Sequence, residues 1–151
     1  MKTIIRNAIF TAIAVGIFSF GLSPANAAEH EIKYRKGIMK AVGGTMGSLA
    51  AVLKNQAPKE HARPLAMTMR NLASIVPEIF PASSDFGETA ALPAIWEKPA
   101  EFKSALNAFT LAAAILPDAA AKGGEDYKIA FVALGKACKG CHETFRKKKE
   151  Q

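Results

Sequence analysis

The chain contains 151 residues, with 20 basic and 13 acidic side chains and a net charge of +7. This length suits a single domain rather than a multidomain protein, and the sequence shows neither internal repeats nor low-complexity segments. Both cysteines belong to one short motif near the C-terminus, which excludes a structural disulfide elsewhere.

The first 27 residues have the organisation of a secretory signal peptide. Lys2 and Arg6 form a positive start, and residues 8–20 are an apolar run of 13 residues without charge. Pro24 follows this run, and residues 25–27 have the small-residue pattern of a cleavage site. A membrane-spanning helix would need about 20 apolar residues, so we predict a cleaved signal, 1–27, rather than an uncleaved anchor.

The remaining residues, 28–151, are predicted to form the mature domain, with 18 basic and 13 acidic side chains and a charge of +5. No other stretch is expected to span a membrane. The surplus charge is concentrated in residues 146–149, which we interpret as a solvated helix end whose cations complement the helix dipole. Steering of acidic partners is the second interpretation. Export predicts a periplasmic location, where nucleic acid is not an expected partner.

Apolar residues recur at helical spacing in four segments of the mature domain. The first stripe runs from Ile32 to Leu53 and includes one charged residue, Arg35. The other stripes run over residues 65–76, 102–116 and 127–145. Proline cannot continue a helical hydrogen-bond ladder, so the second and third helices are predicted to end at Pro77 and Pro117.

A stretch of about 20 residues, 77–98, separates the second and third predicted helices. Loops of this length usually have a functional or packing role. We expect this one to pack on the helices because it is rich in large apolar residues, namely Ile79, Phe80, Phe86, Leu92, Ile95 and Trp96. Four amphipathic helices without strand signals predict an all-α fold, an antiparallel four-helix bundle with this long loop.

The most specific motif is Cys138-Lys139-Gly140-Cys141-His142, which is typical of a c-type haem attachment site. Each thiol can add across one haem vinyl group, and the adjacent His142 can become an axial ligand of the iron. A zinc site would need about four protein ligands, and a thioredoxin-like redox pair would need a βαβ context. The motif therefore predicts one covalently attached haem c per chain.

The chain resembles the class II c-type cytochromes, the cytochrome c′ family and its low-spin relatives of the cytochrome c-556 type. Three segments are similar: residues 32–39, 93–96 and 135–146, the last of which contains the haem motif. The resemblance covers essentially the whole mature chain. It implies a four-helix bundle that holds its haem on the C-terminal helix.

The resemblance also implies a position for Met39 over the distal face of the haem. Low-spin members use a methionine sulfur there as the sixth iron ligand, and Met/His ligation raises the reduction potential. The alternative is that Met39 only fills the core, as most buried methionines do. We expect ligation, because the stretch from Leu72 to Trp96 looks more like the low-spin type.

Two arginines are candidate haem contacts. Arg35 lies on an otherwise apolar stripe, where an unpaired charge is expensive. A haem propionate would be a suitable partner through a charge-assisted bond, and the resemblance agrees; the alternative is a side chain that reaches water at the bundle end. Arg146 lies four residues after His142 and is expected either at the haem edge or as a helix-end cation. The remaining histidines, His30 and His61, are expected on the surface.

These features predict a periplasmic electron carrier rather than an enzyme, because the first stripe offers only Met39 and Arg35 and no acid–base pair. The alternative function is binding of nitric oxide or carbon monoxide at a vacant sixth site. Expected partners are periplasmic redox proteins. The resemblance also implies a homodimer through the first two helices, and the glycines at positions 43, 44 and 47 permit close approach of a partner helix or of the haem face.

Overall fold

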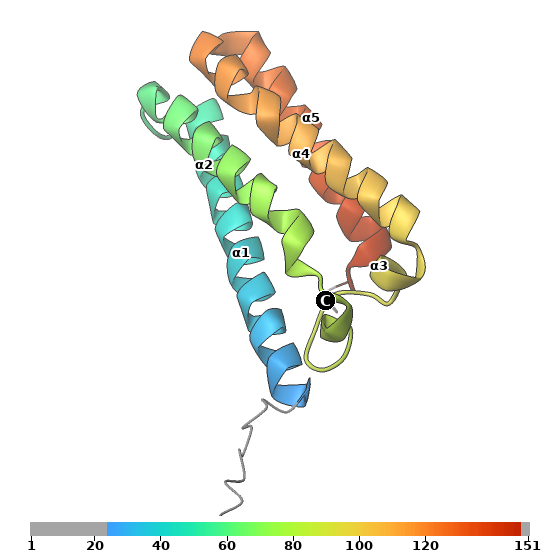
Figure 1. The fold of residues 1–151 in the computed structure, drawn as a ribbon. Coiled ribbons are helices and arrows are strands. Elements are labelled where there is room, and N and C mark those ends of the chain that lie inside the picture. The colour runs from blue at the N-terminus through green and yellow to red at the C-terminus, as the bar shows by residue number, and fades with distance from the viewer. Residues whose placement is uncertain (1–23, 149–151) are drawn as a thin grey trace, which may run out of the picture.

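The structure is a computed structural model that describes residues 24–148. Its four long helices are α1 (Pro24–Leu53), α2 (Ala62–Ile75), α4 (Pro99–Lys122) and α5 (Gly124–Phe145). Short helical segments lie between them: η1 (Lys59–His61), η2 (Val76–Ile79), η3 (Ala82–Ser84) and α3 (Ala94–Glu97). Consecutive long helices run antiparallel, which confirms the predicted four-helix bundle (Figure 1).

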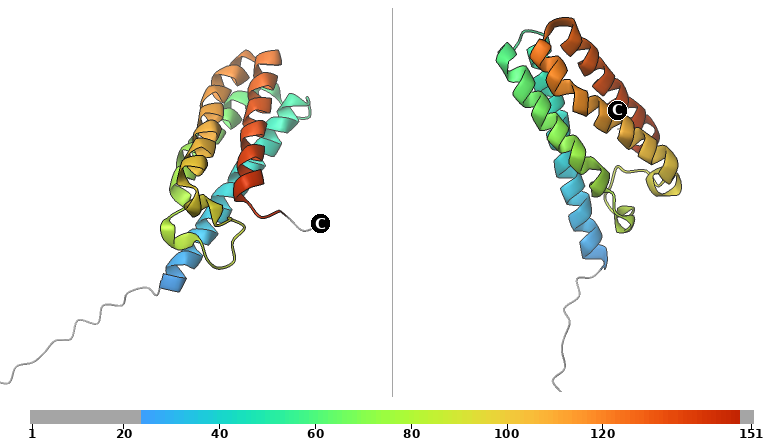
Figure 2. Two further views of the ribbon diagram at one scale, coloured as in Figure 1. Left: turned by 90° about the vertical axis from the view of Figure 1, so that its right-hand side faces the viewer. Right: turned by 45° about the horizontal axis from the view of Figure 1, so that its top comes forward.

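The helices pack as two pairs. Short connections join α1 to α2 and α4 to α5, and α2 packs along α4 between the pairs (Figures 1 and 2). By contrast, α1 and α5 contact each other least among the neighbouring long helices. The bundle is therefore closed along α2 and α4 and looser between its first and last helices.

Each long helix contributes one fully buried large side chain to the centre of the core. These residues are Leu49, Met69, Leu116 and Leu134, each with 0% exposure. Burying a side chain of this kind stabilises a fold by about 1.5–3 kcal/mol. The apolar stripes predicted from the sequence are thus the faces that meet inside the bundle.

The inner face of α1 follows the predicted stripe, with Ile32, Arg35 and Leu49 buried. The lysines between these positions, Lys33, Lys36 and Lys40, are exposed as expected. The glycines at positions 43, 44 and 47 are also exposed, and a Cβ added to any of them would meet nothing within 4 Å. No contact within the described chain accounts for them, so both explanations offered above still apply.

The prediction that the third long helix ends at Pro117 is wrong, because α4 continues to Lys122. A proline within a helix removes one backbone hydrogen bond. Here both Pro117 and Ala120 are buried in the core, and this packing holds the helix past the proline. Gly123 ends α4 instead, with a φ of 71° that favours glycine.

The long loop packs on the bundle as predicted, although it contains η2, η3 and α3 rather than irregular chain alone. The Leu92 N–H donates to the Phe145 carbonyl at 3.0 Å, and the Lys147 N–H donates to the Ala90 carbonyl at 2.8 Å. These two bonds flank a bridge between Ala91 and Arg146. The loop therefore holds the end of α5 in place.

The predicted signal peptide and the expectation that no further stretch could span a membrane can both be compared with the structure. Residues 1–23 of the predicted signal lie outside the described residues, and the predicted cleavage site falls in the first turn of α1. Contrary to expectation, α4 is long and apolar enough to cross a membrane by length and composition alone. However, α4 packs between α2 and α5 and buries Phe109 and Leu116, as expected for a helix of a bundle core.

Tyr127 provides a test of the contact between α5 and α1. Its hydroxyl donates to the Leu49 carbonyl at 2.7 Å, and burial raises the pKa of Tyr127 above its usual value of 10.0. Tyr127→Phe should lower the free energy of unfolding by about 1 kcal/mol at neutral pH, measured by urea denaturation.

Tyr127→Phe should also change how the free energy of unfolding depends on pH. Above about pH 10 the unfolded tyrosine loses its proton while the folded one retains it, so the natural protein loses stability as pH rises. The stability gap between the natural protein and Tyr127→Phe should therefore narrow at high pH. Tyr34→Phe, at a tyrosine that is 52% exposed, is the control. A constant gap would contradict this account of Tyr127.

Candidate haem-binding site

The haem motif lies on the last two turns of α5, with its cysteines turned toward the core. Cys138 packs against the main core, and Cys141 packs against a smaller cluster around Phe102 and Phe145. Both thiols are half-buried and free, while the imidazole of His142 is exposed. His142 lies four residues after Cys138 on the same helix and is more exposed than either thiol.

Aromatic rings support the end of α5 that carries the motif. The rings of Phe80 and Phe102 are 5.0 Å apart, and those of Phe102 and Phe145 are 5.2 Å apart. Both pairs are edge-to-face, an arrangement that stabilises by about 0.5–1.5 kcal/mol beyond the area buried. Since Phe80 belongs to the long loop, this aromatic row joins loop, α4 and α5 beside Cys141.

Burial adjusts the protonation of the motif. It raises the pKa of both Cys138 and Cys141, and the proximity of Cys138 raises that of Cys141 further. Although the His142 side chain is exposed overall, partial desolvation by the surrounding chain lowers its pKa, and the Arg146 charge lowers this pKa further. The thiols are therefore protonated and resistant to oxidation at neutral pH, and the imidazole is neutral with a lone pair available to a metal.

The alignment of α1 with α5 shows at which level of the bundle Met39 lies relative to the haem motif. A Cβ added to Gly135 would lie 3.6 Å from Met46 Cε, so these residues are neighbours on the two helices. The helices run antiparallel (Figure 1). Met39 lies seven residues before Met46, and His142 lies seven residues after Gly135, which is about two turns in each case. Met39 and His142 are therefore at the same level of the bundle.

Arg35 is buried, with 4% exposure, and is held by the long loop rather than by water. One terminal nitrogen donates to Ser84 Oγ at 2.6 Å and to the Ile79 carbonyl at 3.3 Å. The other donates to the Ser84 carbonyl at 2.9 Å and to Thr89 Oγ1 at 2.8 Å. All four acceptors belong to residues 79–89, so Arg35 fastens this part of the loop to α1.

The surroundings of Arg35 also include aromatic faces. Its guanidinium carbon lies 5.1 Å from the centre of the Phe80 ring and 6.0 Å from that of Trp96. Burial lowers the pKa of Arg35, and the Glu31 charge opposes this shift. A haem propionate near Arg35 would accept hydrogen bonds from the same two terminal nitrogens that already donate to the loop oxygens. The loop acceptors were missed from the sequence, although a charge on an apolar stripe signals that buried acceptors must exist.

The remaining candidates lie on the surface. Arg146 is exposed at the end of α5, where its backbone forms the bridge to Ala91. His30 and His61 are exposed, as expected. The basic residues Lys147 and Lys148 are exposed too, while Lys149 lies outside the described residues.

The residues present fit a covalent haem. Cys138 and Cys141 supply two protonated thiols one helical turn apart, and His142 follows them with a neutral imidazole. Met39 supplies a thioether at the same level on the facing helix, half-buried beside the core. Among the neighbouring long helices, α1, which carries Met39, and α5, which carries the motif, make the weakest contact.

Comparison with known proteins gives consistent matches. A family model described as Cytochrome C′ matches residues 30–146. A cytochrome c-554 of Cereibacter sphaeroides is 38% identical over 130 residues, which cover 82% of this chain and 85% of the relative. A cytochrome c-556 of Agrobacterium tumefaciens is 37% identical over 126 residues, covering 79% and 98%. The ferrous structure of a cytochrome c′ variant from Alcaligenes xylosoxidans, with bound NO, superimposes with a TM-score of 0.74 at 29% identity, covering 81% and 97%.

The loop contacts of Arg35 can be tested by Arg35→Leu. The substitution leaves buried loop oxygens without a donor, so we expect the free energy of unfolding to fall by about 3 kcal/mol. Amides of residues 79–92 should also lose protection in hydrogen exchange. Arg70→Leu removes an exposed arginine from α2 and is the matched control. Unchanged protection of the loop in Arg35→Leu would contradict the fastening role.

Proposed function

Since the chain belongs to the cytochrome c′ family, whose members bind covalently attached haem c, we propose that it is an exported carrier of single electrons. Cys138 and Cys141 form the thioether bonds, His142 is the proximal ligand and Met39 is the distal ligand. The observation that supports this proposal most is the register of α1 on α5, in which Met39 is level with His142.

The attachment residues are suited to hold a large planar group rigidly. Cys138 and Cys141 are one turn apart on a helix, so two covalent bonds fix both position and rotation relative to α5. The aromatic row at Phe102 and Phe145 and the loop bonds to the end of α5 restrain the helix itself. His142 is thereby held in one orientation, which a stable axial bond requires.

Met39 and His142 together suit electron transfer. Haem c, when bound, supplies a one-electron couple at its iron. Met39 would supply a thioether and His142 an imidazole to the haem iron, and two such protein ligands would keep rearrangement on electron transfer small. Since Met/His ligation raises the potential, Met39 also sets the range in which the carrier works.

An electron carrier needs no catalytic acid–base pair, and the inner face of α1 supports this view. The residues around Met39 on this face are Ile38 and Val42, both apolar, and the nearby Arg35 is engaged by four hydrogen bonds to the loop. We therefore propose a non-enzymatic role. A haem propionate remains our proposed additional partner for Arg35, and Arg146 our proposed residue at the haem edge.

A second candidate function is binding of nitric oxide or carbon monoxide. It is favoured by the similarity to the Alcaligenes xylosoxidans protein, whose structure contains bound NO. Met39 is only half-buried, and a flexible thioether can pack beside a haem without ligating it. In that case the sixth position would be open to a small gas.

The same family membership supports a proposal for the location and the partners of the protein. We propose that the protein works in the periplasm, after removal of residues 1–27, and that it exchanges electrons with periplasmic redox proteins. The exposed cations Arg146, Lys147 and Lys148 lie at the end of the helix that carries the motif. They would steer an acidic partner toward that end, more strongly at low ionic strength.

The covalent attachment can be tested with cysteine variants made in a host that matures c-type cytochromes. Cys138→Ala combined with Cys141→Ala should give a polypeptide of bare mass that carries no haem on a denaturing gel. Each single variant should retain the haem through the other thioether. His142→Ala should retain covalent haem but change its visible spectrum. A colourless natural protein, or covalent pigment on the double variant, would overturn the assignment.

The role of Met39 can be tested by visible spectroscopy of the haem-loaded protein. The natural protein should show low-spin bands with a sulfur-to-iron transition and should resist carbon monoxide. Met39→Ala should become high-spin and bind carbon monoxide, because the sixth ligand is removed. Met46→Ala removes a methionine two turns away on α1 and should leave the spectrum unchanged. A natural protein that is high-spin, or a low-spin Met39→Ala, would favour gas binding or another ligand.

A further inference from the structure

The residues that follow the predicted cleavage site are Ala28, Glu29 and His30. Removal of residues 1–27, which is part of the proposed function, gives Ala28 a free amino group and makes His30 the third residue of the chain. The amine, the backbone nitrogens of the second and third residues and the imidazole of the third can surround one metal ion in a plane. A planar set of nitrogen ligands is the arrangement that Cu²⁺ and Ni²⁺ prefer.

The structure leaves this end of the chain open to solvent. α1 begins beyond the end of the long loop (Figures 1 and 2), and the side chains of Glu29 and His30 are exposed. The side chain of Ala28 is buried, with 1% exposure, but the nitrogen that cleavage frees lies where residue 27 was attached. The amine and the imidazole are therefore both accessible to an ion.

Cleavage also frees the two backbone nitrogens that the ion needs. In an α-helix each N–H donates to the carbonyl four residues earlier, so the acceptors for Glu29 and His30 belong to residues 25 and 26 of α1. Both acceptors leave with the signal peptide, and the two N–H groups then have no partner within the helix. Residues 28–30 can thus leave the helix without breaking a hydrogen bond of their own N–H groups, while buried Ile32 and Arg35 hold the helix after them.

The charge of the complex suits the start of a helix. The partial positive charge of the helix dipole at this end repels a free cation. When Cu²⁺ binds to the two backbone nitrogens, each loses its proton to water and becomes negative. The two negative nitrogens balance the charge of the ion, and the amine and imidazole add none. The complex is neutral overall, so the dipole does not oppose it.

We propose that the mature chain binds one Cu²⁺ ion through the amine of Ala28, the backbone nitrogens of Glu29 and His30, and the imidazole of His30. Ni²⁺ fits the same planar set but binds more weakly, in keeping with the usual order of divalent metals. Zn²⁺ favours a tetrahedral set of ligands and is not expected to compete.

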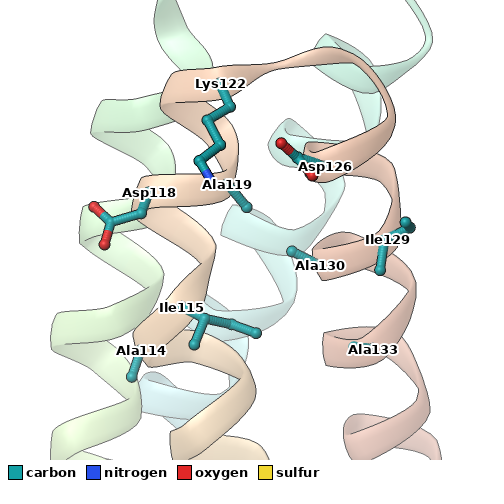
Figure 3. A pocket seen from close by; sticks show the side chains of 9 residues that line it. All are labelled: Ala114, Ile115, Asp118, Ala119, Lys122, Asp126, Ile129, Ala130 and Ala133. Carbon is teal, nitrogen blue, oxygen red and sulfur yellow. The ribbon is translucent and has the colours of Figure 1, made fainter.

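The rest of the described chain offers no competing site made of side chains. No group of three or more His, Cys, Asp or Glu side chains that could hold a metal occurs within residues 24–148. Asp118 and Asp126 line a groove between α4 and α5, but Lys122 lines it too (Figure 3). His61 is exposed in η1, at the opposite end of α1 from His30. Tight copper binding should therefore depend on His30.

The proposed copper site is separate from the haem site. His30 lies nine residues before Met39, which is about 14 Å along α1. Copper should therefore leave the axial ligands of the iron unchanged. The visible spectrum of the haem thus reports on the haem site independently of copper binding.

The test is a titration of the exported, haem-loaded ferric protein with Cu²⁺ at neutral pH, with glycine as a competing ligand. The intact mass identifies the first residue and the haem, and electron paramagnetic resonance identifies the copper ligands. We expect a mature chain that starts at Ala28, one Cu²⁺ per chain with a planar four-nitrogen signal, and an unchanged haem spectrum. Zn²⁺ should bind at least about tenfold more weakly.

Two substitutions address different ligands of the set. His30→Gln removes the imidazole. Glu29→Pro keeps the amine and the imidazole but has no backbone N–H to lose, and proline is tolerated in the first turn of a helix. Each should weaken copper binding by about 100-fold or more, because the linked ligands no longer act together. His61→Gln is the matched control at an exposed histidine and should bind as the natural protein does.

A glycine inserted between residues 27 and 28 moves His30 to the fourth position and should behave like His30→Gln. Circular dichroism and the haem spectrum verify that each variant is folded. Full copper affinity in Glu29→Pro or in the insertion variant, or loss of the signal in His61→Gln, would overturn the proposal. A mature chain that starts at another residue would overturn it as well. A colourless protein that binds copper in this way would instead support the copper site and overturn the proposed haem function.

Discussion

The packing of the inner face of α5 against the rest of the bundle is the constraint on which the structure depends. The same helix stripe contains Leu134 at the centre of the core and Cys138 and Cys141 at its lower end. A core interior tolerates little movement, because its side chains are packed as densely as organic crystals. The packing of Leu134 in the core therefore fixes the positions of the two thiols on α5. A substitution that disturbs this packing would change both the stability of the fold and the geometry of the haem-attachment motif.

The long loop completes the end of the bundle where the motif lies. Arg35 fastens it to α1, and backbone bonds from Leu92 and Lys147 fasten it to the end of α5. The loop thus connects the first and last helices where their direct contact is weakest. The loop, rather than direct packing of α1 on α5, therefore holds these two helices together at this end of the bundle.

The sequence predicted the bundle and the motif because both depend on local patterns: helical periodicity for the fold, and two cysteines before a histidine for the site. It failed at Pro117, where core packing outweighs a lost backbone bond. It also did not reveal the loop acceptors of Arg35, because they lie 44 to 54 residues away in the sequence. The exposed apolar residues on the outer face of α4 and α5 were missed as well. Leu111 and Ile129 have the same chemistry as core residues, and only the neighbours seen in three dimensions distinguish exposed from buried positions.

The half-burial of Cys138 and Cys141 imposes an order on biogenesis. In the finished protein each sulfur faces packed side chains of α4, the loop or the central core. A haem is a rigid planar group that has to reach both sulfurs, so it requires α5 to be unpacked from the bundle when the thioether bonds form. Attachment of haem c is therefore favoured before the bundle compacts, because a chain that compacted first would shield the two sulfurs.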